Sequence, residues 1–576
     1  MIKKVFRRIV IMFIAIIFVL RSIITFSQDE NILINIGSDT MQTFRGIGFN
    51  LNQYQPWVDN LPAGNRVNYV KNLVNIWGFN SVVLWGDKWG TECCGANDPR
   101  NAVDTTQFEI RENVLQTVRW LHEAGMENML MMPIRDRPEA QHVDFWTNCA
   151  LMWKNKGVDI TGMSFLNKPN TGHGFQDSGT SRREPDSIVS GIKALKAELE
   201  LKELSDVKIF GPSVVEWHPR QFATFGDSYD FEDGDTAAYL NPLVADSVAM
   251  SSLYAIDMQS YGRGLTNWEY NLASQAGKEL WVSLSATDGL NNNMNDPILG
   301  PISAGNLLSN LNHGVTLWHH WLLSDLTNTD GSFKQRMFYI VNISTNINPG
   351  ARLRSCTSDS PDLPSPDMRW NYNLQEDGTV TDWQPDIISA AGENPDETWF
   401  IGVVNLSGIR SQHKASDYLG TPLTYHVTIR AEELSPYQVL FNTFKCSDVG
   451  GIIPAGTDTM RNGMLEFTLE SKDLLVLKSF EKTDMPDYLH DIEDPAKWLK
   501  IYPNPAYDKV FVELPGYNGK LRAVVYDLTG KMMCSGNMSN GDALDINNLF
   551  GGTYILMIRD EDGNIFRQKL IIHRKY

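Results

Sequence analysis

The residues best placed for chemistry follow an apolar run that ends abruptly near the middle of the chain. Residues 163–170 read MSFLNKPN, so the apolar stretch gives way to the polar tetrapeptide at 167–170. Because proline disfavours helical geometry in the residue before it, we expect an extended strand that presents Lys168 at its carboxyl end. A lysine amine there could donate a proton if burial lowered its pKa. The alternative, which we favour, is a structural ammonium paired with a carboxylate such as Glu216 or Asp257.

The elements around this strand alternate between short apolar strands and longer helical patterns from about Phe44 to Ile347. Such alternation predicts parallel β–α units. Eight strands favour a (β/α)8 barrel over a doubly wound open sheet, since no glycine-rich nucleotide loop follows the first strand. Functional residues of a barrel lie at the carboxyl ends of its strands. The expected strands cover residues 44–49, 81–85, 128–133, the stretch ending at 168, 207–211, 253–259, 279–285 and 314–318.

The chain becomes β-rich after the barrel. We assign residues 28–347 to the barrel domain and residues 348–480 to a β-sandwich, which residues 31–36 could help to complete. Residues 481–499 are acidic and contain proline, as expected of a linker to a last domain at 500–576. The sandwich strands are expected at 398–405, 423–430, 438–444, 465–469 and 473–479.

The amino terminus has the layout of a secretory signal peptide over residues 1–27. Four basic residues precede an apolar run at 9–20, and polar residues follow it. The alternative is a membrane anchor, but the run is shorter than the about 20 residues that span a bilayer and is closed by Arg21. No other segment is long and apolar enough, so we expect no transmembrane span in the mature chain.

Composition limits the ligands that the protein can take. The formal net charge of −19 argues against a nucleic-acid partner, which requires clustered lysine and arginine. The six cysteines are too few and too scattered for a dense disulfide framework. They also lack the paired spacing with nearby histidines that a metal site needs, so we expect no metal and no cofactor.

The carboxyl-terminal region reads as a small all-β module, with turns at 529–530 and 551–552 and a strand at 553–558. Its motifs at 503–505, 527–531 and 552–555 resemble the type A C-terminal sorting domain of the type IX (Por) secretion system. The resemblance implies export across both membranes by that machinery, followed by release or attachment to the cell surface. The alternative is an ordinary immunoglobulin-like sandwich.

The region from about 42 to 480 is similar to the glycoside hydrolases of clan A, most of all to family thirty, which join a (β/α)8 barrel to a β-sandwich. The motifs that carry this likeness are QTFRGIG at 42–48, NKPN at 167–170, LWVS at 280–283 and the segment 338–350. Family members place an acid/base glutamate between the asparagine and proline of strand four, and a nucleophilic glutamate after the serine or threonine of strand seven. These positions hold Lys168 and Leu284 here.

The substitutions remove the chemistry that the family uses. A retaining glycosidase needs two carboxyl groups about 5 Å apart, one to protonate the leaving oxygen and one to attack the anomeric carbon. Leu284 has no lone pair with which to attack carbon, so double displacement through that position is excluded. Lys168 could replace only the proton donor.

Other carboxylates at strand ends could substitute for the missing pair. An inverting mechanism tolerates a wider separation, about 6.5–9.5 Å, with room for water between the two groups. The simpler alternative is that these acids solvate loops or bind cations. The candidates are Asp87, Glu216, Asp257 and Asp288.

Aromatic residues at the same strand ends suggest a sugar-binding cleft, because flat rings stack on pyranose faces. The resemblance gives Asn167 a hydrogen bond to a sugar hydroxyl, and we expect Gln259, His319 and His320 to add polar contacts. Each aromatic alone is better explained by core packing, but several at one rim favour a cleft. These aromatics are Trp85, Trp89, Trp217, Tyr261, Trp318 and Trp321.

The sequence therefore predicts a secreted or cell-surface, glycosidase-like protein that binds a glycan at the barrel mouth and has lost the two-glutamate mechanism. Two alternatives stay open. One is an active glycoside hydrolase that uses relocated carboxylates. The other is a surface adhesin or scaffold without a glycan site, which rim tryptophans buried in the core would favour.

Overall fold

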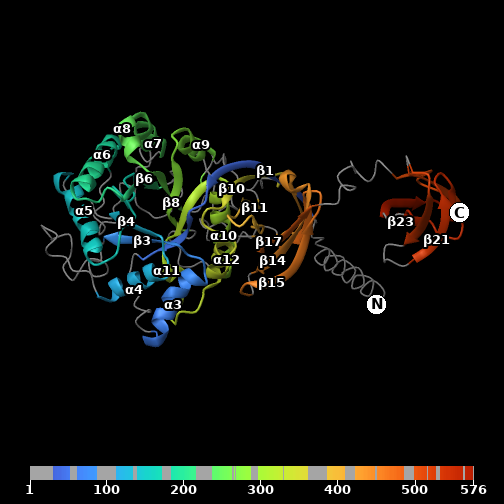
Figure 1. Ribbon diagram of the computed structural model, residues 1–576, viewed down its shortest axis with the longest axis horizontal. Helices are drawn as coiled ribbons and strands as arrows, with labels where there is room; N and C mark the ends of the chain where they lie inside the picture. The colour runs from blue at the N-terminus through green and yellow to red at the C-terminus, as the bar shows by residue number, and fades with distance from the viewer. Residues whose placement is uncertain are drawn as a thin grey trace, which may run out of the picture. The chain divides into compact units, whose positions relative to one another are not determined.

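The chain forms two compact units, one ending at Thr483 and one beginning at Asp484 (Figure 1). The computed structural model describes residues 30–51, 61, 63–86, 112–133, 139–170, 183–215, 236–261, 265, 267–286, 296–328, 330–360, 386–408, 422–447, 450–484, 499–514, 517–526, 532–561 and 565–574. The expected signal peptide at 1–27 lies outside these residues.

Eight parallel strands close into a barrel in sequence order, which confirms the predicted architecture. The first strand pairs with both the second and the last, so the barrel has no open edge. The strands are β2 (Gly46–Asn50), β3 (Ser81–Gly86), β4 (Asn128–Pro133), β5 (Gly162–Ser164), β6 (Lys208–Val215), β7 (Ala255–Tyr261), β8 (Glu279–Ala286) and β9 (Val315–His320).

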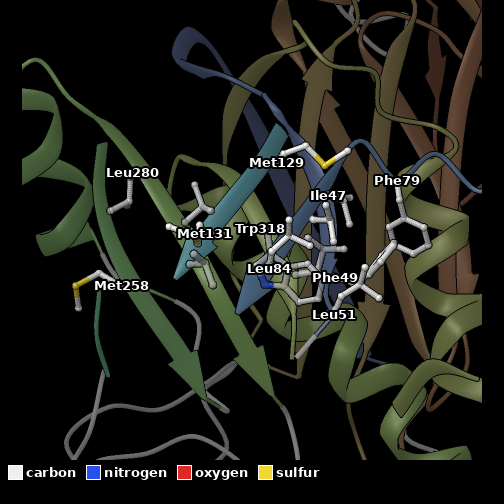
Figure 2. Packing of buried hydrophobic residues seen from close by; sticks show 14 of the residues in the cluster. Ile47, Phe49, Leu51, Phe79, Leu84, Met129, Met131, Met258, Leu280 and Trp318 are labelled. Atoms are coloured by element: carbon white, nitrogen blue, oxygen red, sulfur yellow. The ribbon is translucent and has the colours of Figure 1, made fainter. Parts of the chain in front are cut away.

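Helices cover the outside of the barrel with their apolar faces (Figure 1). Figure 2 shows Ile47, Phe49 and Leu51 of the first strand pointing into this outer layer together with Leu84 and Trp318. The helices are α3 (Ala63–Asn75), α4 (Glu112–Glu123), α5 (Glu139–Asn155), α6 (Pro185–Leu201), α7 (Thr236–Ala245), α8 (Ser247–Ser252), α9 (Asn267–Gln275), α10 (Asp296–Asn312), α11 (Leu323–Leu326) and α12 (Gln335–Ser344).

The fourth barrel strand, which was expected to end at Lys168, ends earlier. β5 stops at Ser164, and Lys168 has a φ of +52° instead of extended geometry. The prediction for Lys168 was therefore wrong, and tertiary hydrogen bonds give the reason. The N–H of Asn167 donates to the carbonyl of Pro133 (2.9 Å), and the N–H of Lys168 donates to the carbonyl of Ser213 (3.1 Å). These bonds draw the chain over the ends of β4 and β6 and hold Lys168 in a sparsely populated conformation.

A nine-stranded sheet follows the barrel in the first unit. Its interior core takes residues from strands near both ends of the order, including Ile401, Val427 and Phe441, so the sheet folds over on itself in two layers. The strand order is β15 (Ile453–Met460), β14 (Tyr437–Cys446), β17 (Leu474–Asp484), β12 (Trp399–Asn405), β11 (Ile387–Glu393), β10 (Arg352–Ser358), β1 (Glu30–Thr43), β13 (Tyr425–Ala431) and β16 (Met464–Leu469).

The sheet and the barrel share one hydrophobic core. Ala390, Phe400 and Val476 on the outer face of the sheet belong to the same cluster as Leu307 of α10 and Ile340 of α12. β1 precedes the barrel in the chain but lies inside the sheet, between β10 and β13. The chain segments before and after the barrel therefore both belong to the sheet, which attaches the barrel to the sheet at both of its ends in the sequence.

The second unit is an all-β module with its own core. Among the described residues of the whole chain, no helix is long and apolar enough to cross a membrane. The turn expected at 529–530 lies outside the described residues. One sheet has the order β18 (Lys500–Tyr502), β19 (Lys509–Glu513), β22 (Ala543–Asp545), and the other has the order β21 (Met532–Ser539), β20 (Lys520–Tyr526), β23 (Gly552–Arg559), β24 (Ile565–Ile572).

Candidate functional site

A charged cluster around Glu279, at the start of β8, lies at the amino end of the barrel. Its carboxylate accepts hydrogen bonds from Arg45 (2.7 Å), Tyr254 (2.7 Å), Trp281 (2.9 Å) and Thr316 (3.1 Å). Burial alone would raise the pKa of Glu279, but the hydrogen bonds led by that from Arg45 outweigh it and hold this pKa below its usual value. A (β/α)8 barrel binds its ligands at the carboxyl ends of its strands, so the site is expected there.

Lys168 and the interior cluster that contains Leu284 both contact Trp321 at the carboxyl end of the barrel. The half-buried Lys168 has its Nζ 4.8 Å from the centroid of the Trp321 ring. Leu284 is fully buried in the cluster that fills the barrel interior, and Trp321 packs against that cluster. The N–H of Trp321 donates to the carbonyl of Ser285 at 2.7 Å, which ties the tryptophan to β8. The two positions at which the resemblance expects catalytic carboxylates thus lie near Trp321, and they hold a lysine and a leucine.

The amine of Lys168 is held in a poorly solvated position. Burial lowers the pKa of Lys168 to about 7, so a large share of the amine is neutral at neutral pH. Its contact with the face of Trp321 is favourable when the amine is charged. Lys168 can accept or release a proton near neutral pH, but on its own it offers no path through a glycosyl-enzyme.

A pair of amides lies beside this site. Gln259 on β7 donates from Nε2 to Oδ1 of Asn167 at 2.5 Å, and both side chains are buried. Gln259 is also in register with Leu284 on β8. The structure therefore brings together Asn167, Gln259, Leu284 and Trp321, which come from separate parts of the sequence.

Asp257 lies deeper in the barrel than the mouth. The fully buried carboxylate accepts hydrogen bonds from the Ser213 hydroxyl (2.5 Å) and from the N–H (2.8 Å) and hydroxyl (2.7 Å) of Ser283. The suggested ion pair with Lys168 is not formed within the described part of the chain. Asp257 instead fixes Ser213, which has a φ of +58° and whose carbonyl accepts the N–H of Lys168. Asp257 therefore supports the bend of the chain at Lys168 through Ser213.

Asp257 predicts a specific pH dependence of stability. Burial raises its pKa to about 7, although the bonds from Ser213 and Ser283 favour the ionised form. The unfolded carboxyl titrates near ~3.9, so between these values the folded protein binds more protons than the unfolded chain. The contribution of Asp257 to the free energy of unfolding should therefore fall as pH rises from about 4 to about 7. Asp257→Asn should remove this slope in urea unfolding.

The control is Asp246→Asn, since Asp246 is held ionised at the start of α8 by Lys193 and by backbone N–H groups, which lower its pKa. That stabilisation is present above the unfolded pKa and is lost as pH falls, so the slope has the opposite sign. An unchanged slope in Asp257→Asn would show that Asp257 is ionised in the folded protein throughout this range.

Successive residues of β9, the last barrel strand, point to opposite faces of the sheet. His319 points inward, where the Ser81 hydroxyl lies 2.6 Å from Nε2 and Nδ1 lies 3.2 Å from the Val282 carbonyl. Burial lowers the pKa of His319 to about 4, so the ring is neutral and Ser81 donates to it. Trp318 is fully buried and donates to Asn306 of α10 at 3.0 Å.

Two residues that were expected to contact the ligand lie on the outward side of β9, away from the mouth. Trp318 and His320 lie in the core between the barrel and its helices, because alternate strand residues point to opposite faces. Their assignment to the sugar cleft is corrected accordingly. Of the two rim tryptophans whose side chains are described, Trp318 has the burial that the adhesin alternative expects, whereas Trp321 is half-buried at the mouth.

Several expected site residues fall outside the described part of the chain. These are Asp87, Trp89, Glu216, Trp217 and Asp288, while Trp85 and Tyr261 are described only as backbone in β3 and β7. Sequence reasoning missed Ser213 and Ser283, which hold Asp257 and carry no distinguishing motif. It also missed Asn50, which ends β2 and which the strand-end rule could have selected.

Residues 500–573 match the family described as "Secretion system C-terminal sorting domain". The chain thus carries a type IX sorting domain, which directs it to the cell surface or the extracellular space. No curated protein matches the sequence.

The barrel and sheet have the fold of clan A glycoside hydrolases. A family 30 subfamily 8 xylanase from Clostridium acetobutylicum is 13% identical with a TM-score of 0.53, covering 78% of this chain and 100% of that chain. A family 30 endoxylanase from Clostridium papyrosolvens is 13% identical with a TM-score of 0.52, covering 78% and 100%. A family 30 xylanase from Talaromyces cellulolyticus is 12% identical with a TM-score of 0.53, again covering 78% and 100%. At such identities the likeness is one of fold.

Proposed function

We propose that this exported protein binds a neutral oligosaccharide or polysaccharide at the carboxyl end of its barrel without hydrolysing it by the two-glutamate mechanism. The observation that carries the proposal is the pairing of Lys168 and Leu284 around Trp321. A retaining glycosidase requires two carboxyl groups at this place, and an amine with an alkyl chain cannot form and resolve a glycosyl-enzyme.

The polar groups at the mouth support a neutral, hydroxyl-rich ligand. Asn167 and Gln259 offer an uncharged amide pair, and His319 below them is a neutral imidazole. Amides both donate and accept hydrogen bonds, as sugar hydroxyls do. Trp321 adds an aromatic surface of the kind on which a pyranose ring stacks. Apolar surface with a few convergent polar groups is the usual composition of a small-molecule site.

The proposal is tested by measuring binding and hydrolysis separately on the purified mature protein. Xylan and β-1,6-glucan are suitable first ligands, because fold neighbours are named as xylanases and as an endo-β-1,6-glucanase. Affinity electrophoresis or calorimetry should detect binding, and assays of released reducing ends should detect no turnover. Hydrolysis abolished by mutating Glu216 or Asp288 would instead support the active enzyme. Absence of binding across a wide glycan panel would support the adhesin or scaffold.

Trp321→Ala is expected to weaken glycan binding by at least about tenfold, equivalent to ~1.4 kcal/mol, because it removes the stacking surface. The matched control is Trp268→Ala on α9, where the side chain is 42% exposed on the outside of the barrel. This control should bind as the wild type does. Equal binding by both variants would remove Trp321 from the site.

A further inference from the structure

The carboxyl end of the barrel contains an asparagine that the site described above does not use. Asn50 is the last residue of β2 and is fully buried. It is in register with Val83 of β3, which belongs to the cluster inside the barrel. Its neighbours Phe49 and Leu51 point into the outer layer, as Figure 2 shows. The amide of Asn50 therefore points into the barrel.

This amide is not satisfied by the protein. Neither Oδ1 nor Nδ2 of Asn50 has a hydrogen-bond partner within the described chain. Ser164, which ends β5 and is in register with the interior residue Phe210, has a buried hydroxyl in the same condition. Buried polar groups are nearly always paired, because leaving them unpaired destabilises the fold. These two groups at strand ends of one barrel leave hydrogen-bonding capacity that a bound molecule can fill.

The position of Asn50 connects it to Trp321. Phe49 of β2 is paired in register with His320 of β9. Asn50 ends β2 and Trp321 directly follows the last residue of β9, so the two residues leave this pair of strands at the same level of the mouth. A ring stacked on Trp321 therefore lies within reach of the Asn50 amide.

The residues that lie below Asn50 inside the barrel are tightly packed and hydrogen-bonded. Gly48, two residues earlier on the same face, has no side chain, and a Cβ there would lie 2.6 Å from Cδ2 of His319. The imidazole fills this space and is held by Ser81 and by the Val282 carbonyl. The amide thus stands on a fixed base, which favours recognition of one ligand geometry.

The chemistry of an amide defines the group that it can take. Oδ1 accepts and the adjacent Nδ2 donates, and neither bears a formal charge. Two neighbouring hydroxyls of a sugar ring present the complementary pair, one donating to Oδ1 and the other accepting from Nδ2. We infer that Asn50 binds adjacent hydroxyl groups of the sugar ring that stacks on Trp321 and so selects sugars at this position. The inference rests on the proposed glycan-binding function and goes beyond it by naming a specificity-determining residue.

The test replaces Asn50 by leucine, which has nearly the same size and no polar group. Asn50→Leu should weaken binding of xylan or β-1,6-glucan, whichever the wild type binds, by at least tenfold. It should also raise the Tm of the unliganded protein or leave it unchanged, because an unsatisfied amide is removed. A merely structural asparagine would give the opposite shift in Tm. The control is Asn310→Leu. Asn310 is also fully buried, but its amide is hydrogen-bonded to Ser260, Asn306 and Leu265. The Tm of this variant should therefore fall.

The ligand side gives a second, independent measurement. An oligosaccharide of the bound type that lacks one of two adjacent hydroxyls should bind wild type more weakly than its parent, and the two should bind Asn50→Leu equally. If Asn50→Leu bound the glycan as tightly as the wild type does, the inference would be overturned and the proposed function would stand. Failure of the wild type to bind any glycan would overturn the proposed function and the inference with it. A Tm lowered as far as in Asn310→Leu would also overturn the inference, because the amide would then have partners within the fold.

Discussion

The double substitution Lys168→Glu with Leu284→Glu is expected to create glycoside hydrolysis where the wild type has none. Lys168 follows β5 and contacts Trp321, and Leu284 lies near the end of β8 in the cluster against which Trp321 packs, so both are near the place where an acid/base and a nucleophile would act. Carboxyl groups at both positions would supply the two steps of a retaining mechanism. We expect activity at least about a hundredfold above the wild-type background, the low end of the gain from one positioned acid. Release of reducing ends from the bound polysaccharide measures it.

Single substitutions provide the controls for this experiment. Lys168→Glu and Leu284→Glu each supply one carboxyl group, so each should remain near the wild-type background. Lys168→Glu with Leu284→Gln matches the size and polarity of the double variant without a nucleophile. Because Leu284 is fully buried, folding of every variant is checked by its unfolding transition. A folded double variant that stays inactive would show that these positions do not correspond to the catalytic pair.

Gly48→Ala is expected to prevent the barrel from closing normally. A Cβ at this position would lie 2.2 Å from the carbonyl oxygen of Ser81 and 2.6 Å from Cδ2 of His319. The first contact is with the backbone of β3, which cannot move without breaking its pairing with β2. We expect a loss of about 3 kcal/mol or more in the free energy of unfolding, or insoluble protein.

The matched control for this change is Gly64→Ala in α3, where a Cβ meets no atom within 4 Å. Alanine is the better helix former, so this variant should be as stable as the wild type or slightly more so. Urea unfolding followed by circular dichroism compares the two variants. Equal stability of Gly48→Ala and Gly64→Ala would mean that the contact of Gly48 with β3 is not tight.

The barrel was predictable because each β–α unit leaves a local pattern of apolar periodicity. The end of the fourth strand was not, because the conformation of Lys168 depends on the carbonyls of Pro133 and Ser213, which only the folded chain brings near. The same limit applies to β1, whose partners lie far along the sequence. Local residue patterns carry no information about such distant hydrogen bonds.

The candidate site was partly predictable, since the strand-end rule selected Gln259 and Trp321 and the resemblance to clan A glycoside hydrolases selected Asn167. The rule failed on Trp318 and His320, because a strand buried on both faces shows no apolar–polar alternation to reveal which residues point inward. Asn50 was overlooked for the same reason. Irregular pairing between β8 and its neighbours further shifts which side chains reach the interior near Leu284.

The place of β1 in the sheet has a consequence for how the chain folds as it is made. Ile34 lies opposite Ser358 of β10, and Glu30 lies beside Tyr425 of β13, so the strand synthesised first pairs with strands that emerge hundreds of residues later. Folds dominated by such long-range pairings have high contact order and form slowly. The shared core of sheet and barrel, which includes Leu474 and Val476, cannot be completed until β17 has left the ribosome. This delay favours a chain that is still unfolded when its export begins.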